Sequence, residues 1–143
     1  MKRAEALRPL SREHLAALTA AKALREAADP RRAGASFLDF WQRDGRRHFR
    51  VEEEVLLPGW ALAAEVDRPG VARMLEEHLA IRRAALRIEA AEASLSELHE
   101  LGQLLHDHVR FEERELFPLV EAALEPAALD QLGAAIEAAE QEA

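Results

Sequence analysis

The chain has 143 residues, of which 49% are apolar and 32% are charged, and its formal net charge at pH 7 is −8. This length suits one domain with a single core spanning residues 1–143. The acidic balance argues against a nucleic-acid partner, because phosphate binding needs a basic surface. The lack of cysteine excludes disulfides, thiolate metal sites and iron–sulfur clusters. No apolar run resembles a signal peptide or a membrane span, so we expect a cytoplasmic protein with no membrane partner.

Apolar residues recur at three- and four-residue steps from the start of the chain, which predicts helices. We expect the first helix to begin after Ser11, which is a good N-cap residue, and to end near Pro30. The second is expected to run from about residue 34 to residue 57. Pro58 and the glycine after it are expected to end that helix.

The second half of the chain follows the same pattern. A third helix is expected over residues 69–93, and Ser94 or Ser96 is expected to cap a fourth, which Pro118 is expected to kink near its end. A short last helix, over residues 126–140, is expected to pack across the end of the others. Short connections between long amphipathic helices imply antiparallel neighbours. The predicted fold is therefore all-α, an up-down-up-down antiparallel four-helix bundle with a short additional C-terminal helix.

The sequence contains a two-fold internal repeat. EHLA occurs at residues 13–16 and again at 77–80, and the pattern HxRxEExxLxP fits both 48–58 and 108–118. Each half is thus a predicted helical hairpin, with one histidine on its first helix and an HxxxE pair on its second. A repeated unit in a bundle suggests that equivalent residues meet at the centre.

Six side chains of this repeat fall on the core faces of the predicted helices, because residues four apart on a helix point in nearly the same direction. A histidine or a carboxylate in a leucine-rich core is unfavourable unless it is paired or bound, so their convergence predicts a cation site. Imidazole and carboxylate without thiolate suit iron, manganese or zinc, and one glutamate from each half is suited to bridge two metals. The candidate metal ligands are His14, His48, Glu52, His78, His108 and Glu112.

The order H…HxxxE…H…HxxxE on four successive helices resembles the hemerythrin-like, or HHE cation-binding, family. The resemblance extends over residues 14–118, and it implies a non-haem centre of two iron ions with a bridging oxo or hydroxo group. Zinc or manganese in an expressed sample is compatible with the same residues. The implied assignment gives His14 and His48 to one iron, His78 and His108 to the other, and Glu52 and Glu112 to both as bridges.

One position departs from the oxygen-carrying members of the family. Those carriers have a further histidine ligand four residues after the one on the third helix, and Arg82 stands there in this chain. Arginine cannot ligate a metal, so we expect two irons with near-equivalent ligands and open positions, which disfavours reversible oxygen carriage.

Three functions from different classes remain at this point. The leading hypothesis is a di-iron protein that reacts with or senses dioxygen, nitric oxide, peroxide or iron. The alternative is an oxidase or peroxidase-like di-iron enzyme acting on a small oxidant. A scaffold with vestigial metal residues is the third, and the intact set of six argues against it.

The remaining histidines and acidic residues of the repeat are expected to lie outside the centre. His99 and His106 fall off the core stripe of their helix. Glu53 and Glu113 follow the candidate bridges and are expected to be solvated or paired with arginines. The apolar face of the last helix leaves both a monomer and a homodimer open.

Overall fold

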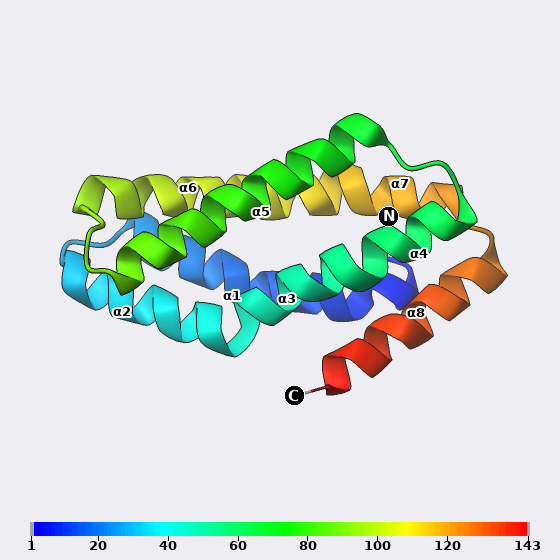
Figure 1. Ribbon diagram of the computed structural model, residues 1–143, viewed down its shortest axis with the longest axis horizontal. Helices are drawn as coiled ribbons and strands as arrows, with labels where there is room; N and C mark the ends of the chain where they lie inside the picture. Colours follow the sequence, from blue (N-terminus) through cyan, green and yellow to red (C-terminus); the bar gives the residue numbers. More distant parts are fainter. Residues whose placement is uncertain (1, 143) are drawn as a thin grey trace.

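The computed structural model describes residues 2–142, and all regular secondary structure in this range is helical (Figure 1). Long helical rods run along the longest axis of the molecule, and α8 lies against their outside (Figure 1). The α-helices are α1 (Arg8–Arg25), α2 (Pro30–Phe40), α3 (Arg46–Val51), α4 (Leu57–Ala63), α5 (Arg68–Glu89), α6 (Leu95–Phe111), α7 (Phe117–Ala123) and α8 (Pro126–Gln141). Three π-turns join some of these helices without a break: η2 (Trp41–Gly45), η3 (Glu52–Leu56) and η4 (Glu112–Leu116). Within residues 2–142, no helix combines the length and the apolar character needed to cross a membrane.

The first two helices begin earlier than the sequence pattern predicts. A short 3₁₀ turn, η1 (Glu5–Leu7), leads into α1, so the prediction of Ser11 as its N-cap is wrong. Ser11 lies inside the helix, and its hydroxyl donates a hydrogen bond to Glu113 (2.7 Å). The second helix begins at Pro30 rather than near residue 34, because Asp29 caps it and proline fits the first turn of a helix.

The prediction that Pro58 ends the second helix is also wrong. The rod continues from α2 through α4 to Ala63, and the π-turn η3 precedes the proline. The N–H of Leu57 donates to the carbonyl of Glu52, five residues back. The backbone hydrogen bonds therefore change from one spacing to another immediately before Pro58. Proline has no N–H to donate, and at this change of spacing the helix does not need one.

The repeat places the same device in the second half of the chain. The π-turn η4 stands before Pro118, and the helix continues through α7 to Ala123. Upstream, α5 ends at Glu89 rather than near residue 93, and Ala91 follows with a left-handed φ of 57°. Ser94 caps α6 as predicted, in a reciprocal capping box with Glu97.

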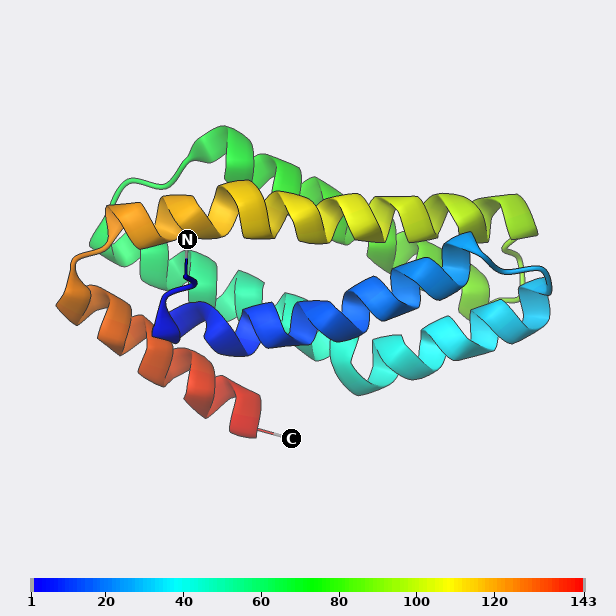
Figure 2. The same cartoon turned by 180° about the vertical axis from the view of Figure 1, so that it is seen from behind.

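The helices pack in a closed arrangement around two apolar clusters. α1 lies beside α6 and also contacts α2, and α5 completes the circuit between α2 and α6 (Figures 1 and 2). One cluster, which includes Leu56, Trp60 and Ile136, extends toward α8, and the other extends toward the loop between α5 and α6. Phe49 and Val51 belong to different clusters although they are two residues apart, so the boundary between the clusters crosses the rod near the HxxxE pair.

Candidate metal centre

All six candidate ligands are buried at this boundary, with exposed fractions between 0% and 5%. Two come from single helices, α1 and α5, and four come from the paired segments α3–η3 and α6–η4. In each HxxxE pair, the glutamate is the first residue of a π-turn. Six polar side chains in the dry interior require compensation, because a buried charge without a partner is strongly unfavourable.

The six side chains form two groups that share both glutamates. The first group contains His14 and His48, and the second group contains His78 and His108. Within each group, four potential ligand atoms all lie within 4.8 Å of one another. Each half of the internal repeat therefore supplies both histidines of one group, one from a lone position and one from an HxxxE pair, and the two halves meet through the shared glutamates.

Glu52 turns one carboxylate oxygen to each group. Its Oε2 lies 3.2 Å from the Nε2 atom of His48, and its Oε1 lies 3.2 Å from the Nε2 atom of His78. No part of the Glu52 side chain is exposed, so both oxygens face only the interior of the protein.

Glu112 does the same from the opposite half. Its Oε1 lies 2.9 Å from the Nε2 atom of His14, and its Oε2 lies 3.1 Å from the Nε2 atom of His108. Each of the two carboxylates presents one oxygen to the first group and the other oxygen to the second. This arrangement suits the binding of two cations at once.

The outer edge of every candidate histidine is held by a further glutamate. We call these four the outer glutamates. The Nδ1–H groups donate from His14 to Glu113 (2.6 Å), from His48 to Glu13 (2.7 Å), from His78 to Glu53 (2.5 Å) and from His108 to Glu77 (2.8 Å). Such partners fix the tautomer and ring orientation of a ligating histidine and raise its basicity. Each ring therefore turns Nε2, and not Nδ1, toward the centre.

An arginine accompanies each outer glutamate. The nitrogen–oxygen distances are 2.7 Å for Arg82 and Glu53, 3.1 Å for Arg73 and Glu77, 3.3 Å for Arg3 and Glu113, and 3.6 Å for Arg47 and Glu13. Burial alone would raise the pKa of Glu53, but its hydrogen bonds to His78 and then to Arg82 lower it, so these contacts keep the carboxylate ionised.

The buried groups shift one another's protonation strongly. Burial by itself would lower the pKa of His78, but its close contacts with the carboxylates of Glu112, Glu52 and Glu53 raise it to about 10. The pKa of His108 is raised to about 9, against the effect of burial, by the charge and the close approach of Glu112. Conversely, the pKa of Glu112 is held well below its usual range by His108, His14 and His78, although burial opposes the shift. The centre is thus built to hold positive charge against buried carboxylates, either as protons or as metal ions.

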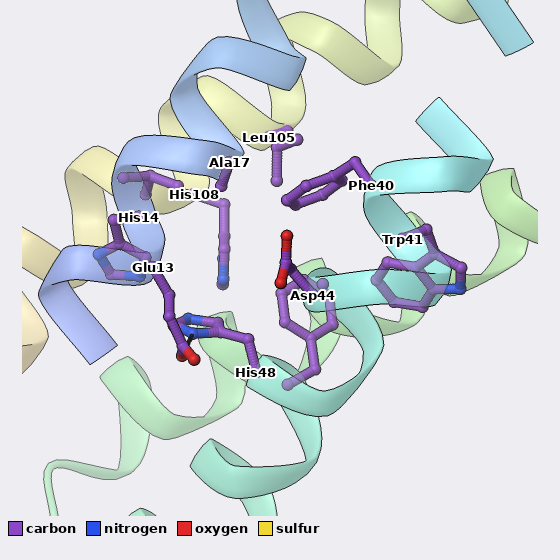
Figure 3. Close-up of a pocket in the computed structure, with 12 residues that line it drawn as sticks. Glu13, His14, Ala17, Phe40, Trp41, Asp44, His48, Leu105 and His108 are labelled. Carbon is purple, nitrogen blue, oxygen red and sulfur yellow. Dashed lines mark hydrogen bonds and ion pairs between the residues drawn. The ribbon is translucent and has the colours of Figure 1, made fainter. Parts of the chain in front are cut away.

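Aromatic rings cover the centre on both sides. Phe49 stacks on the ring of His78 with centroids 3.7 Å apart, and Phe117 stacks on His14 at 5.4 Å. A small cavity of about 10 Å³ adjoins the first group and has Gly45 on its wall; Figure 3 shows its lining, with Glu13 turned toward His48. A cavity of this size holds about one water molecule, so the packing leaves little solvent beside the centre.

Several polar atoms of the centre are buried and accept or donate no hydrogen bond within residues 2–142. They are His48 Nε2, His78 Nε2, His108 Nε2, both carboxylate oxygens of Glu52, and Glu112 Oε2. Buried polar groups in native proteins are almost always paired, and leaving one unpaired costs about 1–3 kcal/mol. All of these atoms face the same interior space. Two imidazole nitrogens and two carboxylate oxygens per group, with no thiolate, fit iron, manganese or zinc.

A profile of the hemerythrin HHE cation binding domain family matches residues 6–120. The chain belongs to this family. No curated protein and no solved structure matches it. The match spans all six candidate ligands and all four outer glutamates of this hemerythrin HHE domain, and it stops before α8. Membership of a cation-binding family and a buried cluster with unpaired ligand atoms agree on cation binding as the property of this domain.

Arg82 is turned to an outer glutamate in this HHE domain. Its Nη1 atom donates to Glu53 at 2.7 Å, and its guanidinium lies 5.7 Å from the ring centroid of Phe49. Arg82 supplies no ligand atom to the second group, so each group consists of two imidazole nitrogens and two carboxylate oxygens.

Two histidines of the HHE domain lie outside both groups. The Nε2–H group of His99 donates to the backbone carbonyl of Ala27 (2.8 Å), which ties α6 to the end of α1. His106 is partly exposed and contacts Asp107. Neither has a place in the centre.

The outer glutamates were the functional residues that the sequence reasoning underestimated. Glu53 and Glu113 do pair with arginines, as predicted, but they also fix two of the histidines. Glu13 and Glu77 were not singled out, although each stands directly before a candidate ligand in the repeated EHLA segment. The signal was the repetition itself, since it preserves a glutamate beside each lone ligand histidine and beside each bridge.

Proposed function

We propose that this hemerythrin HHE domain is a di-iron protein that reacts with or senses dioxygen, nitric oxide, peroxide or iron. In this proposal the chain is an up-down-up-down four-helix bundle with α8 added, it works in the cytoplasm, and the six candidate residues bind two iron ions. The observation that carries it is the sharing of both glutamates between the two groups, because a single cation does not need two separate pairs of imidazoles.

Each part of the chain has a task in this function. Glu52 and Glu112 are the proposed bridges, and their burial keeps both oxygens of each available to the metals. The outer glutamates orient the imidazoles, and Phe49 and Phe117 limit the access of bulk water. Bound iron would supply a redox-active Lewis acid with affinity for small oxidants.

A second candidate is an oxidase or peroxidase-like enzyme acting on a small oxidant. The observation that favours it is the engagement of Arg82 with Glu53, because the second group then has no fifth nitrogen ligand from that position. A centre with few protein ligands leaves coordination positions for reaction, and not only for reversible binding.

One experiment separates these functions. The protein is purified from iron-supplemented cells, its iron is quantified, and its absorption is recorded before and after the addition of oxygen, azide or hydrogen peroxide. About two irons per chain with ligand-dependent absorption bands support the proposal, and sustained consumption of peroxide or oxygen selects the enzyme. A protein that takes up no metal and melts at the same temperature when metal is offered refutes both.

A further inference from the structure

Exposed leucines are concentrated on one helix, α5. Six large apolar side chains within residues 2–142 are exposed, and three of them, Leu75, Leu79 and Leu86, lie on α5. Leu79 and Leu86 are each 65% exposed. The other three exposed leucines lie singly on α1, α4 and α7. Single apolar side chains are ordinary on a protein surface, whereas several gathered on one helix face indicate an interaction surface.

The three leucines form a stripe along the outside of α5. At about 100° per residue, they fall within about 40° of one another around the helix axis, over a length of about 17 Å. Together with Arg82 they are spaced by four, three and four residues, which is the spacing of the seam between two packed helices. The guanidinium of Arg82 is bound to Glu53, to which Nη1 donates at 2.7 Å, so this position contributes mainly an alkyl stem to the stripe.

The rest of the described chain leaves this stripe uncovered. In Figure 1, α5 lies in front of α6, and no other helix is drawn over it. The apolar face of α8, which is the other candidate for a contact between two copies, is already used within the chain, where Leu132 and Ile136 are buried. A cover for the stripe therefore has to come from outside residues 2–142.

The stripe is self-complementary about a two-fold axis. When a second α5 packs antiparallel with the axis between residues 80 and 81, Leu75 of each copy faces Leu86 of the other. Leu79 of each copy then faces the Arg82 stem of the other. Every apolar group of the stripe thereby meets an apolar group, as a symmetric contact between identical chains requires.

Two charges beside the stripe favour the same arrangement. Glu76 and Arg83 are exposed and lie about 20° apart around the axis, so both flank the stripe on one side. Neither forms an ion pair within residues 2–142, unlike Arg82 on the same helix, which pairs with Glu53. In the antiparallel arrangement, Glu76 of each copy lies within about 3 Å, along the helix axis, of Arg83 of the other, so the two copies form two ion pairs.

We propose that α5 is a self-association surface, at which two copies of this chain pack their leucine stripes antiparallel. The leucines provide apolar burial, and the two pairs of Glu76 with Arg83 fix the direction and register of the helices. A contact made by one helix from each chain is small, so we expect a concentration-dependent dimer with a Kd of about 10–100 µM. The leucines supply no ligand atom to either metal group, so this dimer goes beyond the proposed function and does not depend on it.

The test is sedimentation equilibrium of the full chain over a concentration range of about 5–500 µM, which brackets the expected Kd. Leu79→Glu and Leu86→Glu are each expected to weaken dimerisation at least about tenfold, because a symmetric contact receives each new charge twice in its apolar seam. Leu15→Glu is the matched control, since Leu15 holds the same place in the repeated EHLA segment as Leu79 and is 68% exposed, but on α1. This control is expected to dimerise as the wild type does.

A charge exchange tests the antiparallel arrangement itself. Glu76→Arg and Arg83→Glu are each expected to weaken dimerisation about threefold or more, because each sets two pairs of like charges across the contact. The double variant, which carries both substitutions, is expected to dimerise within about twofold of the wild type, because opposite charges face each other again.

Each outcome decides the proposal. A wild-type chain that stays monomeric at the highest concentration overturns it. A dimer that persists in both Leu79→Glu and Leu86→Glu, or that Leu15→Glu dissociates, places the contact on another surface and overturns it as well. A double charge variant that dimerises no better than the single variants overturns the antiparallel pairing of α5.

Discussion

Replacing Glu53 with glutamine tests whether the outer glutamates tune metal binding. Glu53 accepts a 2.5 Å bond from His78 and a 2.7 Å bond from Arg82. Glutamine keeps an oxygen for His78 but removes the negative charge and leaves Arg82 without its counterion. Because the Glu53 side chain is 23% exposed, solvent screens part of this charge, so we expect the lower end of the usual range for such residues. That is about a tenfold loss of affinity for one metal, or about 1.4 kcal/mol.

The assay is an equilibrium competition between the metal-free protein and a chelator of known affinity, with Zn²⁺ or Fe²⁺ as the titrant. Glu54→Gln is the control, since it makes the same change at the next residue, where Glu54 is exposed and pairs with Arg50 at 3.3 Å. The control is expected to bind both metals within about twofold of the wild type, as surface pairs contribute little. Equal affinity in Glu53→Gln and Glu54→Gln would refute the role of the outer glutamates.

Three further predictions follow from the same geometry. His48→Ala and Glu52→Ala are each expected to lower the metal content, as measured by metal analysis. In thermal melts with free metal at 100-fold its Kd, each is expected to lower the free energy of unfolding by about 2.7 kcal/mol per metal lost. An unchanged metal content in both variants contradicts the ligand assignment. Metal affinity is expected to rise from pH 7 to pH 9, by up to about tenfold per pH unit for each proton displaced, because metal must replace a proton on His78, whose pKa is about 10. The same raised pKa stabilises the metal-free protein; this stabilisation is full below pH 6.5 and is lost as the pH rises through 10. Competition titrations in which metal affinity stays flat or falls with pH would contradict this prediction. Gly102→Ala is expected to destabilise the fold by about 1–3 kcal/mol in urea melts, because the added Cβ would lie 2.8 Å from the carbonyl oxygen of Ala21 on α1; wild-type stability would show that α1 and α6 are not held this closely.

The sequence predicted the helical class and the convergence of six polar residues, because both follow from periodicity. Helical spacing alone places His48 and Glu52 on one face, and the internal repeat supplies the second half of the centre. The sequence predicted that the last helix packs across the end of the others; α8 instead lies against the outside of the rods, beside η3 and α3, where Leu132 and Ile136 are buried.

The helix ends were less predictable, since they depend on backbone hydrogen bonds that residue preferences do not describe. Pro58 is a helix breaker in isolation, but the π-turn before it removes the conflict, and the sequence carries no simple marker for a π-turn. The approach of Glu140 to Arg47, at 3.6 Å, was equally hidden, because it depends on the tertiary packing of α8.

The most direct test of the central claim is an anomalous difference map from crystals of the iron-loaded protein, collected at the iron absorption edge. The account predicts two peaks inside the bundle, one beside His14 and His48 and the other beside His78 and His108, with Glu52 and Glu112 between them. A single peak, a peak at the surface, or a bundle interior without anomalous signal in crystals that contain iron would contradict it.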